Sequence, residues 1–194
     1  MRGGACALFM AVVLCGLFCF VVFAQEFSAD IVSTGKEGSS SGKIYTSKNK
    51  IRMEQQGNII ISRIDRNVTW IIMPAEKVYI EQKVDPRNIA GVMDEVPGQV
   101  ERQALGEEEI DGRMTDKYKV DYTYGGETSG MFVWTTQGSN IPVKTMAVDG
   151  SWSMEYKNLR EGPQSDDLFE IPAGYEKMSL DMSQMGNMMQ GSSY

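Results

Sequence analysis

Residues 113–124 read RMTDKYKVDYTY and form the clearest predicted strand in the chain. Every second residue on one side is apolar or aromatic: Met114, Tyr118, Val120, Tyr122 and Tyr124. The residues between them are charged or carry a hydroxyl: Arg113, Lys117, Lys119, Asp121 and Thr123. A period of two is typical of a strand with one buried face and one face in water. The stretch therefore predicts a sheet with a wet face and an aromatic-rich dry face.

The same pattern recurs along the chain. In SWSMEYK, residues 151–157, the side chains of Trp152, Met154 and Tyr156 alternate with polar ones. Runs rich in Val, Ile, Thr, Tyr and Trp are bounded by Gly, Asn, Asp and Pro, which favours an antiparallel all-β domain. We expect strands near 26–35, 42–48, 50–56, 59–65, 68–73, 77–83, 100–110, 113–124, 129–136, 142–149, 151–160 and 168–171.

The hairpin VTWIIMPAEKVYIEQK, residues 68–83, departs from this alternation. Trp70 and Ile72 point to one side of the first strand, while Ile71 and Met73 point to the other. Both faces of this strand are therefore apolar. Each needs a cover, which we expect to be the lid or a ligand on one face and a loop, the N-terminal strand or the C-terminal tail on the other.

One interior segment has the period of a helix. Asp85 can cap it, Pro86 suits its first turn, and Ile89, Val92, Met93 and Val96 follow at helical spacing before Pro97 and Gly98. About three turns would be marginal alone, so the segment needs an apolar surface to lie on. We expect a short lid helix on the dry face of the sheet.

The N-terminus has the pattern of a cleavable secretory signal. Arg2 precedes an apolar run over 5–23, and Val22-Phe23-Ala24 supplies small residues at the cleavage positions. The alternative is a transmembrane anchor, since the run is just long enough to span a bilayer. We expect cleavage after Ala24 (residues 1–24), a periplasmic domain over 25–177 and a tail over 178–194.

Composition excludes several classes of function. The three cysteines all lie before residue 25 and the chain has no histidine. A Ser-His-Asp triad, a thiol nucleophile and a Cys/His zinc site are thus excluded from the mature chain. A net charge of −7 argues against nucleic-acid binding. We expect no catalysis and no cofactor.

The tail carries an unusual density of methionine. Met178, Met182, Met185 and Met189 fall on one stripe of a helix. Thioether sulfur is a soft ligand that selects Cu(I), so Met182, Met185, Met188 and Met189 form a candidate copper site. A lid over a cavity mouth and an oxidisable disordered tail are the alternatives.

Five stretches, taken in order, resemble the LolA-like superfamily, and in particular its small branch of secreted proteins labelled outer-membrane lipoprotein-sorting proteins. They are GKIYTSKNKIRME (42–54), ISRIDRNVTWIIMPAEKVYIE (61–81), EIDGRMTDKYKV (109–120), FVWTTQGSNIPVKT (132–145) and DDLFEIPAGYEKM (166–178). The resemblance implies a mainly β fold, an antiparallel half-open β-barrel with a short lid helix.

The resemblance also implies residue roles. A hydrophobic cavity would be lined by Trp70, Ile72, Tyr118, Val120, Tyr122, Trp152, Met154 and Tyr156. The lid would contribute Ile89, Val92 and Met93. The same aromatic residues would equally fill a closed core, and this alternative stays open here.

The expected function is that of a non-enzymatic periplasmic carrier or binding protein. Its ligand would be a lipid, the acyl chain of a lipoprotein or another apolar molecule, and its partner a lipid or lipidated protein with peripheral membrane contact. An acyl chain binds through burial, at about 0.8 kcal/mol for each methylene. Two alternatives remain, Cu(I) binding by the tail and an envelope interaction module that pairs through a sheet edge.

Overall fold

The computed structural model describes residues 26–36, 38–86, 89, 92 and 96–178. The predicted signal (1–24) and the methionines from Met182 onward lie outside this part of the chain, and so does Met93. Within the described part, no helix reaches the length and apolarity needed to cross a membrane.

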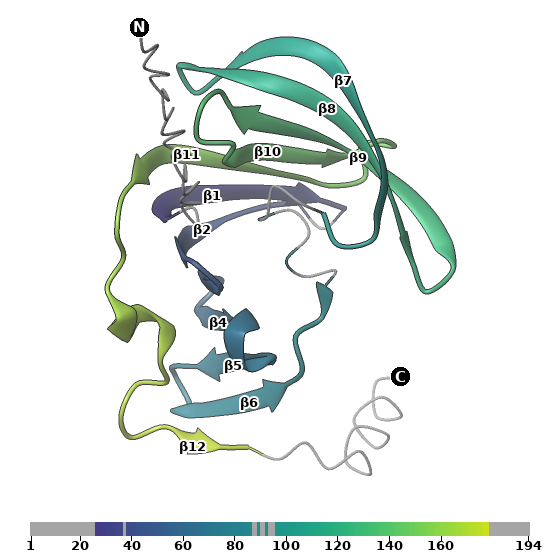
Figure 1. Ribbon diagram of the computed structural model, residues 1–194. Helices are drawn as coiled ribbons and strands as arrows, with labels where there is room; N and C mark the ends of the chain where they lie inside the picture. Colours follow the sequence, from purple (N-terminus) through teal and green to yellow (C-terminus); the bar gives the residue numbers. More distant parts are fainter. Residues whose placement is uncertain (1–25, 37, 87–88, 90–91, 93–95, 179–194) are drawn as a thin grey trace, which may run out of the picture.

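The described residues form one twelve-stranded sheet that does not close (Figure 1). Its strand order is β12-β6-β5-β4-β3-β2-β1-β11-β10-β9-β8-β7. The strands are β1 (Phe27–Gly35), β2 (Gly38–Ser47), β3 (Lys50–Gln55), β4 (Asn58–Arg63), β5 (Val68–Met73), β6 (Val78–Gln82), β7 (Gln99–Ile110), β8 (Arg113–Tyr124), β9 (Glu127–Thr136), β10 (Pro142–Ala147), β11 (Ser153–Glu161) and β12 (Glu176–Lys177). All neighbours are antiparallel except β12 and β6, which are parallel. The mainly β, half-open barrel is thereby confirmed.

Eleven of the predicted strands appear close to their expected positions, and two have the expected bounds, 68–73 and 113–124. The predicted strand at 168–171 is wrong. A short 3-10 helix, η3 (Asp166–Phe169), stands there, and the last strand follows only at β12. The carbonyl groups of Leu168 and Phe169 accept bonds from arginine side chains instead of joining a ladder.

The connection from β6 to β7 is where the lid helix was expected. Its described residues Ile89 and Val92 lie in turns, with backbone bonds from Ile89 to Pro86 and from Val92 to Ile89. Both side chains are buried. The helix itself stays a prediction, because most of the segment lies outside the described residues.

Register defines two faces of the sheet, because residues that pair across antiparallel strands share a face. We call inner the face that carries Ala29, Ile44, Met53, Ile60 and Ile71, which pair in sequence from β1 to β5. The other face is the outer one. Ile89 and Val92 belong to the same buried cluster as Ala29 and Ile44, so the β6–β7 connection packs on the inner face.

The buried apolar residues fall into three clusters. The largest joins the inner face of β1–β3 to the β6–β7 connection and to β9–β11. A second contains Val96, Val120, Met131 and Val133. The third contains Ile61, Trp70, Ile72 and Phe169, and it lies at the other end of the sheet. The core is therefore divided, and each predicted cavity residue can be assigned to one part of it.

Candidate functional site

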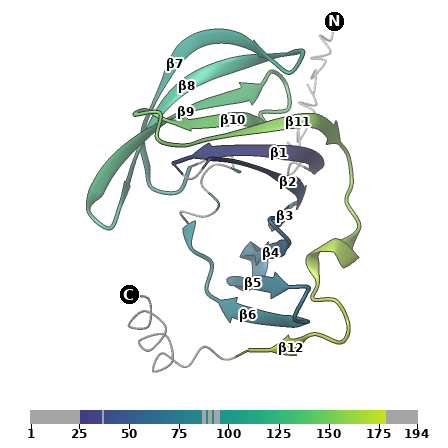
Figure 2. The same ribbon diagram turned by 180° about the vertical axis from the view of Figure 1, so that it is seen from behind.

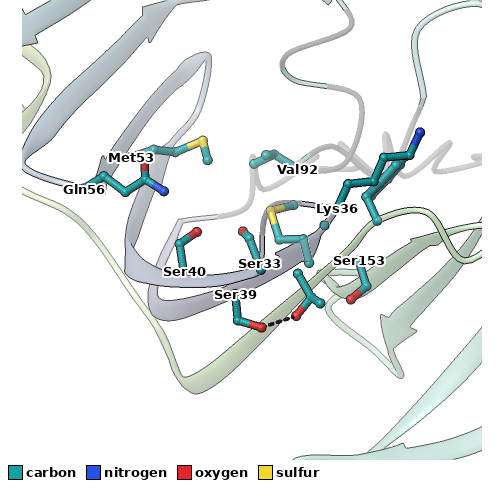
Figure 3. Close-up of a pocket in the computed structure, with 13 residues that line it drawn as sticks. Ser33, Lys36, Ser39, Ser40, Met53, Gln56, Val92 and Ser153 are labelled. Atoms are coloured by element: carbon teal, nitrogen blue, oxygen red, sulfur yellow. Dashed lines mark hydrogen bonds between the residues drawn. The ribbon is translucent and has the colours of Figure 1, made fainter.

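A pocket of about 650 Å³ opens at the end of the β1–β2 hairpin, beside the β10–β11 turn (Figure 3). It is lined by Ser33, Thr34, Gly35, Lys36, Gly38, Ser39, Ser40, Met53, Gln56, Val92, Trp152, Ser153 and Met154. In Figure 3, Met53 and Val92 face Ser33 and Ser40 across the opening. The volume falls in the range of small-molecule sites, about 300 to 1,000 Å³.

The apolar wall of the pocket comes from three separate parts of the chain. Met53 lies on β3, Met154 on β11, Val92 in the β6–β7 connection and Trp152 in the turn before β11. Trp152 is 38% exposed, and both methionines are half-buried. Thioether and indole side chains offer large, adaptable apolar surface. This wall can therefore contact an apolar ligand of irregular shape.

The opposite wall is rich in hydroxyl groups. Ser33 and Ser40 pair across β1 and β2 on the inner face, while Thr34 and Ser39, whose side-chain oxygens share a hydrogen bond of 3.1 Å, lie on the outer face of the same hairpin. The Gln55 amide donates to the Ser40 hydroxyl at 2.8 Å. Lys36 is the one charged residue among the described residues that line the pocket. The pocket thus has an apolar side and a hydrogen-bonding side.

From Met53 the apolar wall continues across the sheet. Met53 pairs with Ile60, Ile60 with Ile71, and Ile71 with Ile80, so four side chains form a row across β3–β6 on the inner face. Ile60 is 38% exposed, and the other three are half-buried. We call these four residues the aliphatic row. It is an apolar surface that the described residues cover only in part.

The inner face of β3–β6 carries no charged side chain among its described residues. By register its twelve members are Ile51, Met53, Gln55, Asn58, Ile60, Ser62, Thr69, Ile71, Met73, Val78, Ile80 and Gln82. The outer face of the same strands carries Lys50, Arg52, Glu54, Arg63 and Glu81. Charge is thus sorted to one side, which leaves the aliphatic row in neutral surroundings.

The outer face is closed by the chain's own C-terminal part, which runs from β11 past η3 to β12 beside β6 (Figure 2). We call residues 165–177 the C-terminal strap. Phe169 is fully buried against Ile61, Trp70 and Ile72. Arg52 donates to the Leu168 carbonyl at 2.9 Å, and Lys50 pairs with Asp166 at 2.5 Å. The strap is anchored by both burial and charge.

Arg63 is the buried cation of this anchor. Its guanidinium pairs with Asp65 at 2.7 Å and with Glu170, and it also donates to the Phe169 carbonyl at 3.4 Å. The hydrogen bond to Asp65 is the largest effect that raises the pKa of Arg63, with burial opposing it and Glu170 adding to it. The same bond lowers the pKa of Asp65. Arg63 is thus a permanent charge that holds the strap.

At the far end of the strap, Glu81 joins β6 to β12. Lys177 pairs with Glu81 at 2.7 Å, and the Trp70 indole donates to the other carboxylate oxygen at 3.1 Å. These contacts, the Lys177 bond first, lower the pKa of Glu81. Backbone bonds from Glu176 to Lys77 and from Met178 to Tyr79 complete the junction.

The structure separates the eight predicted cavity residues. Trp70 and Ile72 lie on the outer face beneath Phe169. Tyr118, Val120 and Tyr122 pack with Val96, Met131 and Val133.

The other three lie nearer the pocket. Tyr156 is buried against Phe27, with ring centroids 5.8 Å apart. Its hydroxyl has no hydrogen-bond partner within the described structure, and burial raises its pKa. Trp152 and Met154 line the pocket together with Val92 of the predicted lid. Only these two of the eight meet at one opening.

Sequence reasoning missed the residues that extend the site, Met53, Ile60 and Ile80. The sequence feature that could have found them is that residues 68–73 are apolar on both faces of their strand. Ile71 is the apolar residue on the side away from Trp70, and its cross-strand neighbours are the rest of the aliphatic row. The described residues also contain no group of three or more Asp, Glu, His or Cys side chains that could hold a metal ion.

No family model and no curated protein matches the chain. Among solved structures, MucB matches with a TM-score of 0.50 and 15% identity, over 79% of this chain and 59% of MucB. PNGF-II matches with a TM-score of 0.50 and 14% identity, over 86% of this chain and 33% of PNGF-II. The chain thus spans less than two thirds of either protein.

A domain from Vibrio parahaemolyticus, described as an outer membrane lipoprotein-sorting protein, matches with a TM-score of 0.38 and 13% identity, over 74% of this chain and 88% of the domain. At 14 to 15% identity, the matches to MucB and PNGF-II show a similarity of fold alone, and function has to be argued from the chain's own residues. The open, mainly antiparallel half-barrel expected from the sequence is the fold of the chain.

Proposed function

We propose that the protein is a non-enzymatic periplasmic binding protein or carrier that holds a lipid, a lipoprotein acyl chain or another apolar ligand against its inner face. One observation carries the proposal. The aliphatic row is apolar, uncharged in its surroundings, partly exposed and continuous with the pocket through Met53. An apolar strip of this kind on a secreted protein is a candidate binding surface.

Burial supplies the binding energy. Four strands at a spacing of about 4.8 Å give the row a length of about 14 Å, enough for an extended hydrocarbon chain. Each methylene moved from water to this surface contributes about 0.8 kcal/mol. The proposed contact residues are Met53, Ile60, Ile71, Ile80, Val92, Trp152 and Met154. Trp70 and Ile72 are left out because the strap already covers them.

The predicted export signal over 1–24 supports a place in the periplasm, where an apolar ligand has to be shielded from water between membranes. The proposed partners are a lipid or a lipidated protein, with peripheral contact to a membrane or to another envelope protein. A carrier role needs no catalytic group, which agrees with a mature chain that lacks His and Cys.

The test uses the secreted chain purified without detergent. Bound lipid is sought by extraction and mass spectrometry, and binding of the neutral dye N-phenyl-1-naphthylamine is followed by fluorescence. We expect saturable dye binding that dodecanol displaces. Ile60→Lys should weaken dye binding about tenfold or more, because a charge would enter a neutral apolar surface.

Val32→Lys is the matched control. Val32 has the same exposure as Ile60, 39% against 38%, but it lies on the outer face of β1, opposite Glu155. Its substitution should leave dye binding unchanged. A protein that neither retains lipid nor binds the dye would contradict the proposal, and so would equal losses in both variants.

A further inference from the structure

One wall of the pocket is polar. Lys36 and Gln56 mark its two ends in Figure 3, and the hydroxyl groups of Ser33 and Ser40 lie between them on the inner face. A pocket that served only a hydrocarbon would not need this wall, because hydroxyl groups turned toward an apolar ligand lose their hydrogen bonds to water.

Lys36 stands out by its charge. It forms no salt bridge or hydrogen bond with any residue that the structure describes. Asp149 in the β10–β11 turn interacts with it at longer range, as the smallest of several effects that lower the pKa of Asp149, after the hydrogen bonds with Ser151. Among the described residues that line the pocket, none is acidic. In a chain of net charge −7, the pocket is thus a local site of positive charge.

The hydroxyl wall is already ordered without a ligand. Ser40 is held by the Gln55 amide at 2.8 Å. Serine hydroxyls keep a rotatable proton and can donate to an oxygen anion. Ser33 pairs with Ser40 across β1 and β2, so two hydroxyls stand side by side on the inner face.

We propose that Lys36 and this hydroxyl wall bind the anionic oxygen head group, carboxylate or phosphate, of a single-chain amphiphile. The tail then passes over Met53 onto the aliphatic row. This inference rests on the proposed function and adds the chemical class of the ligand. It also sets the orientation, since the inner face of β3–β6 offers no charge to a head group.

Gly42 lies between the polar wall of the pocket and the aliphatic row. It lies on β2 between Ser40 and Ile44, and a Cβ built there would come within 2.1 Å of the Glu54 carbonyl oxygen. A side chain at this position would therefore push β2 and β3 apart. Because Gly42 has no side chain, nothing projects from the inner face at this point between the serines and the aliphatic row.

The experiment compares four probes of equal chain length by dye displacement: dodecanoate, dodecyl phosphate, dodecanol and dodecyltrimethylammonium. We expect both anions to bind roughly fivefold tighter than dodecanol, which is the scale of one solvent-accessible ion pair. The cation should bind weakest. The preference should shrink as salt rises, because screening acts on the exposed charge. Which anion binds tighter tells a fatty acid from a phosphate-bearing lipid.

Lys36→Met should remove the preference for anions and leave dodecanol binding unchanged, while Lys36→Arg should keep it. Lys43→Met is the control, since Lys43 lies exposed on the outer face of β2, opposite Asp30. If no probe binds, the proposed function itself fails. If dodecanol and the anions bind equally, or if Lys36→Met binds anions as well as the wild type, the head-group site is refuted while the apolar site stands.

Discussion

Ile71 and Ile72 are neighbours in the chain and have opposite surroundings. Ile72 lies on the outer face of β5 and is fully buried beneath Phe169 of the C-terminal strap. Ile71 lies on the inner face, half-buried in the aliphatic row. The same four strands thus have one face that the chain seals with its own segment and one that it leaves partly open. Both faces are apolar, so what distinguishes them is whether a segment of the chain covers them.

Charged side chains explain how the outer face, which the strap seals, differs from the inner face. Arg63, Arg52 and Lys50 all lie on the outer face, and each contacts the strap. The inner face has no charged residue to anchor a segment of the chain in this way. Such a surface can accept an uncharged tail, because burying that tail leaves no ionic group without a partner.

The largest effect should come from removing the anchor of the sealed face. Phe169→Ala should lower the free energy of unfolding by about 3 to 5 kcal/mol, because a fully buried aromatic ring leaves a cavity against Ile61, Trp70 and Ile72. Urea denaturation measures the loss. Val100→Ala, at a residue that is 63% exposed, should change it by less than about 0.5 kcal/mol. Similar values for the two variants would show that the strap is not a structural cover.

The adjacent pair Ile71 and Ile72 sharpens the comparison. Ile72→Ala should cost about 2 to 5 kcal/mol of stability. Ile71→Ala should cost about 1 kcal/mol and weaken binding of the apolar dye, because its side chain faces the ligand rather than the strap. Denaturation and dye titration on both variants separate the roles. The assignment of faces would be wrong if Ile72→Ala weakened dye binding while leaving stability intact.

The sequence predicted the positions of the strands well. It predicted poorly which segment of the chain covers each face of the sheet. The alternation of residues 113–124 and the turn residues around 68–73 depend on local chemistry, and both strands have the predicted bounds. The period of two in VTWIIM correctly divides Trp70 and Ile72 from Ile71. It does not say which pair the C-terminal strap covers, because that depends on register with β4 and on where residues 165–177 return.

The candidate site shows the same limit. Trp152 and Met154 were predicted from their own strand, and they line the pocket. Met53 and Ile60 come from strands whose patterns are short and less regular, and they enter the site only through pairing. Residues 168–171 do not form the predicted strand. In the structure Arg52 and Arg63 bind their carbonyl groups, which no local pattern reveals.

Arg63 tests the charged part of the anchor. Arg63→Met should cost about 2 to 3 kcal/mol, since it removes bonds to Asp65, to Glu170 and to the Phe169 carbonyl. Both carboxylates are partly exposed and can return to water, so the loss stays below that of a fully buried ion pair. Limited proteolysis should also cut within residues 165–177 sooner than in the wild type.

Arg66→Met is the matched control for that variant. Its side chain is 51% exposed and reaches Glu170 at 3.3 Å, so its removal should cost less than about 1 kcal/mol. Equal losses in the two variants would mean that burial of Arg63 adds nothing to the anchor.

The smallest effect should be the acid sensitivity of the sealed face. Partners in the folded protein lower the pKa of three carboxyl groups there: Lys50 for Asp166, Arg63 for Asp65, and Lys177 with Trp70 for Glu81. A lowered pKa contributes stability that is present above the ordinary values, 3.8 for Asp and 4.5 for Glu, and that is lost as pH falls toward the folded-state values. Stability should thus be flat from pH 7 to about 5 and fall below it.

Trp70 reports this transition, because its indole bonds Glu81 beneath the strap. Its fluorescence should shift between pH 5 and pH 3 in a Trp134→Phe, Trp152→Phe background, and Asp166→Asn should make the fall shallower. Dye binding at the aliphatic row should not follow the same curve until the whole domain unfolds, since no titratable side chain lies on the inner face of β3–β6. If dye binding and Trp70 fluorescence change together at every pH, the two faces are coupled and not independently covered.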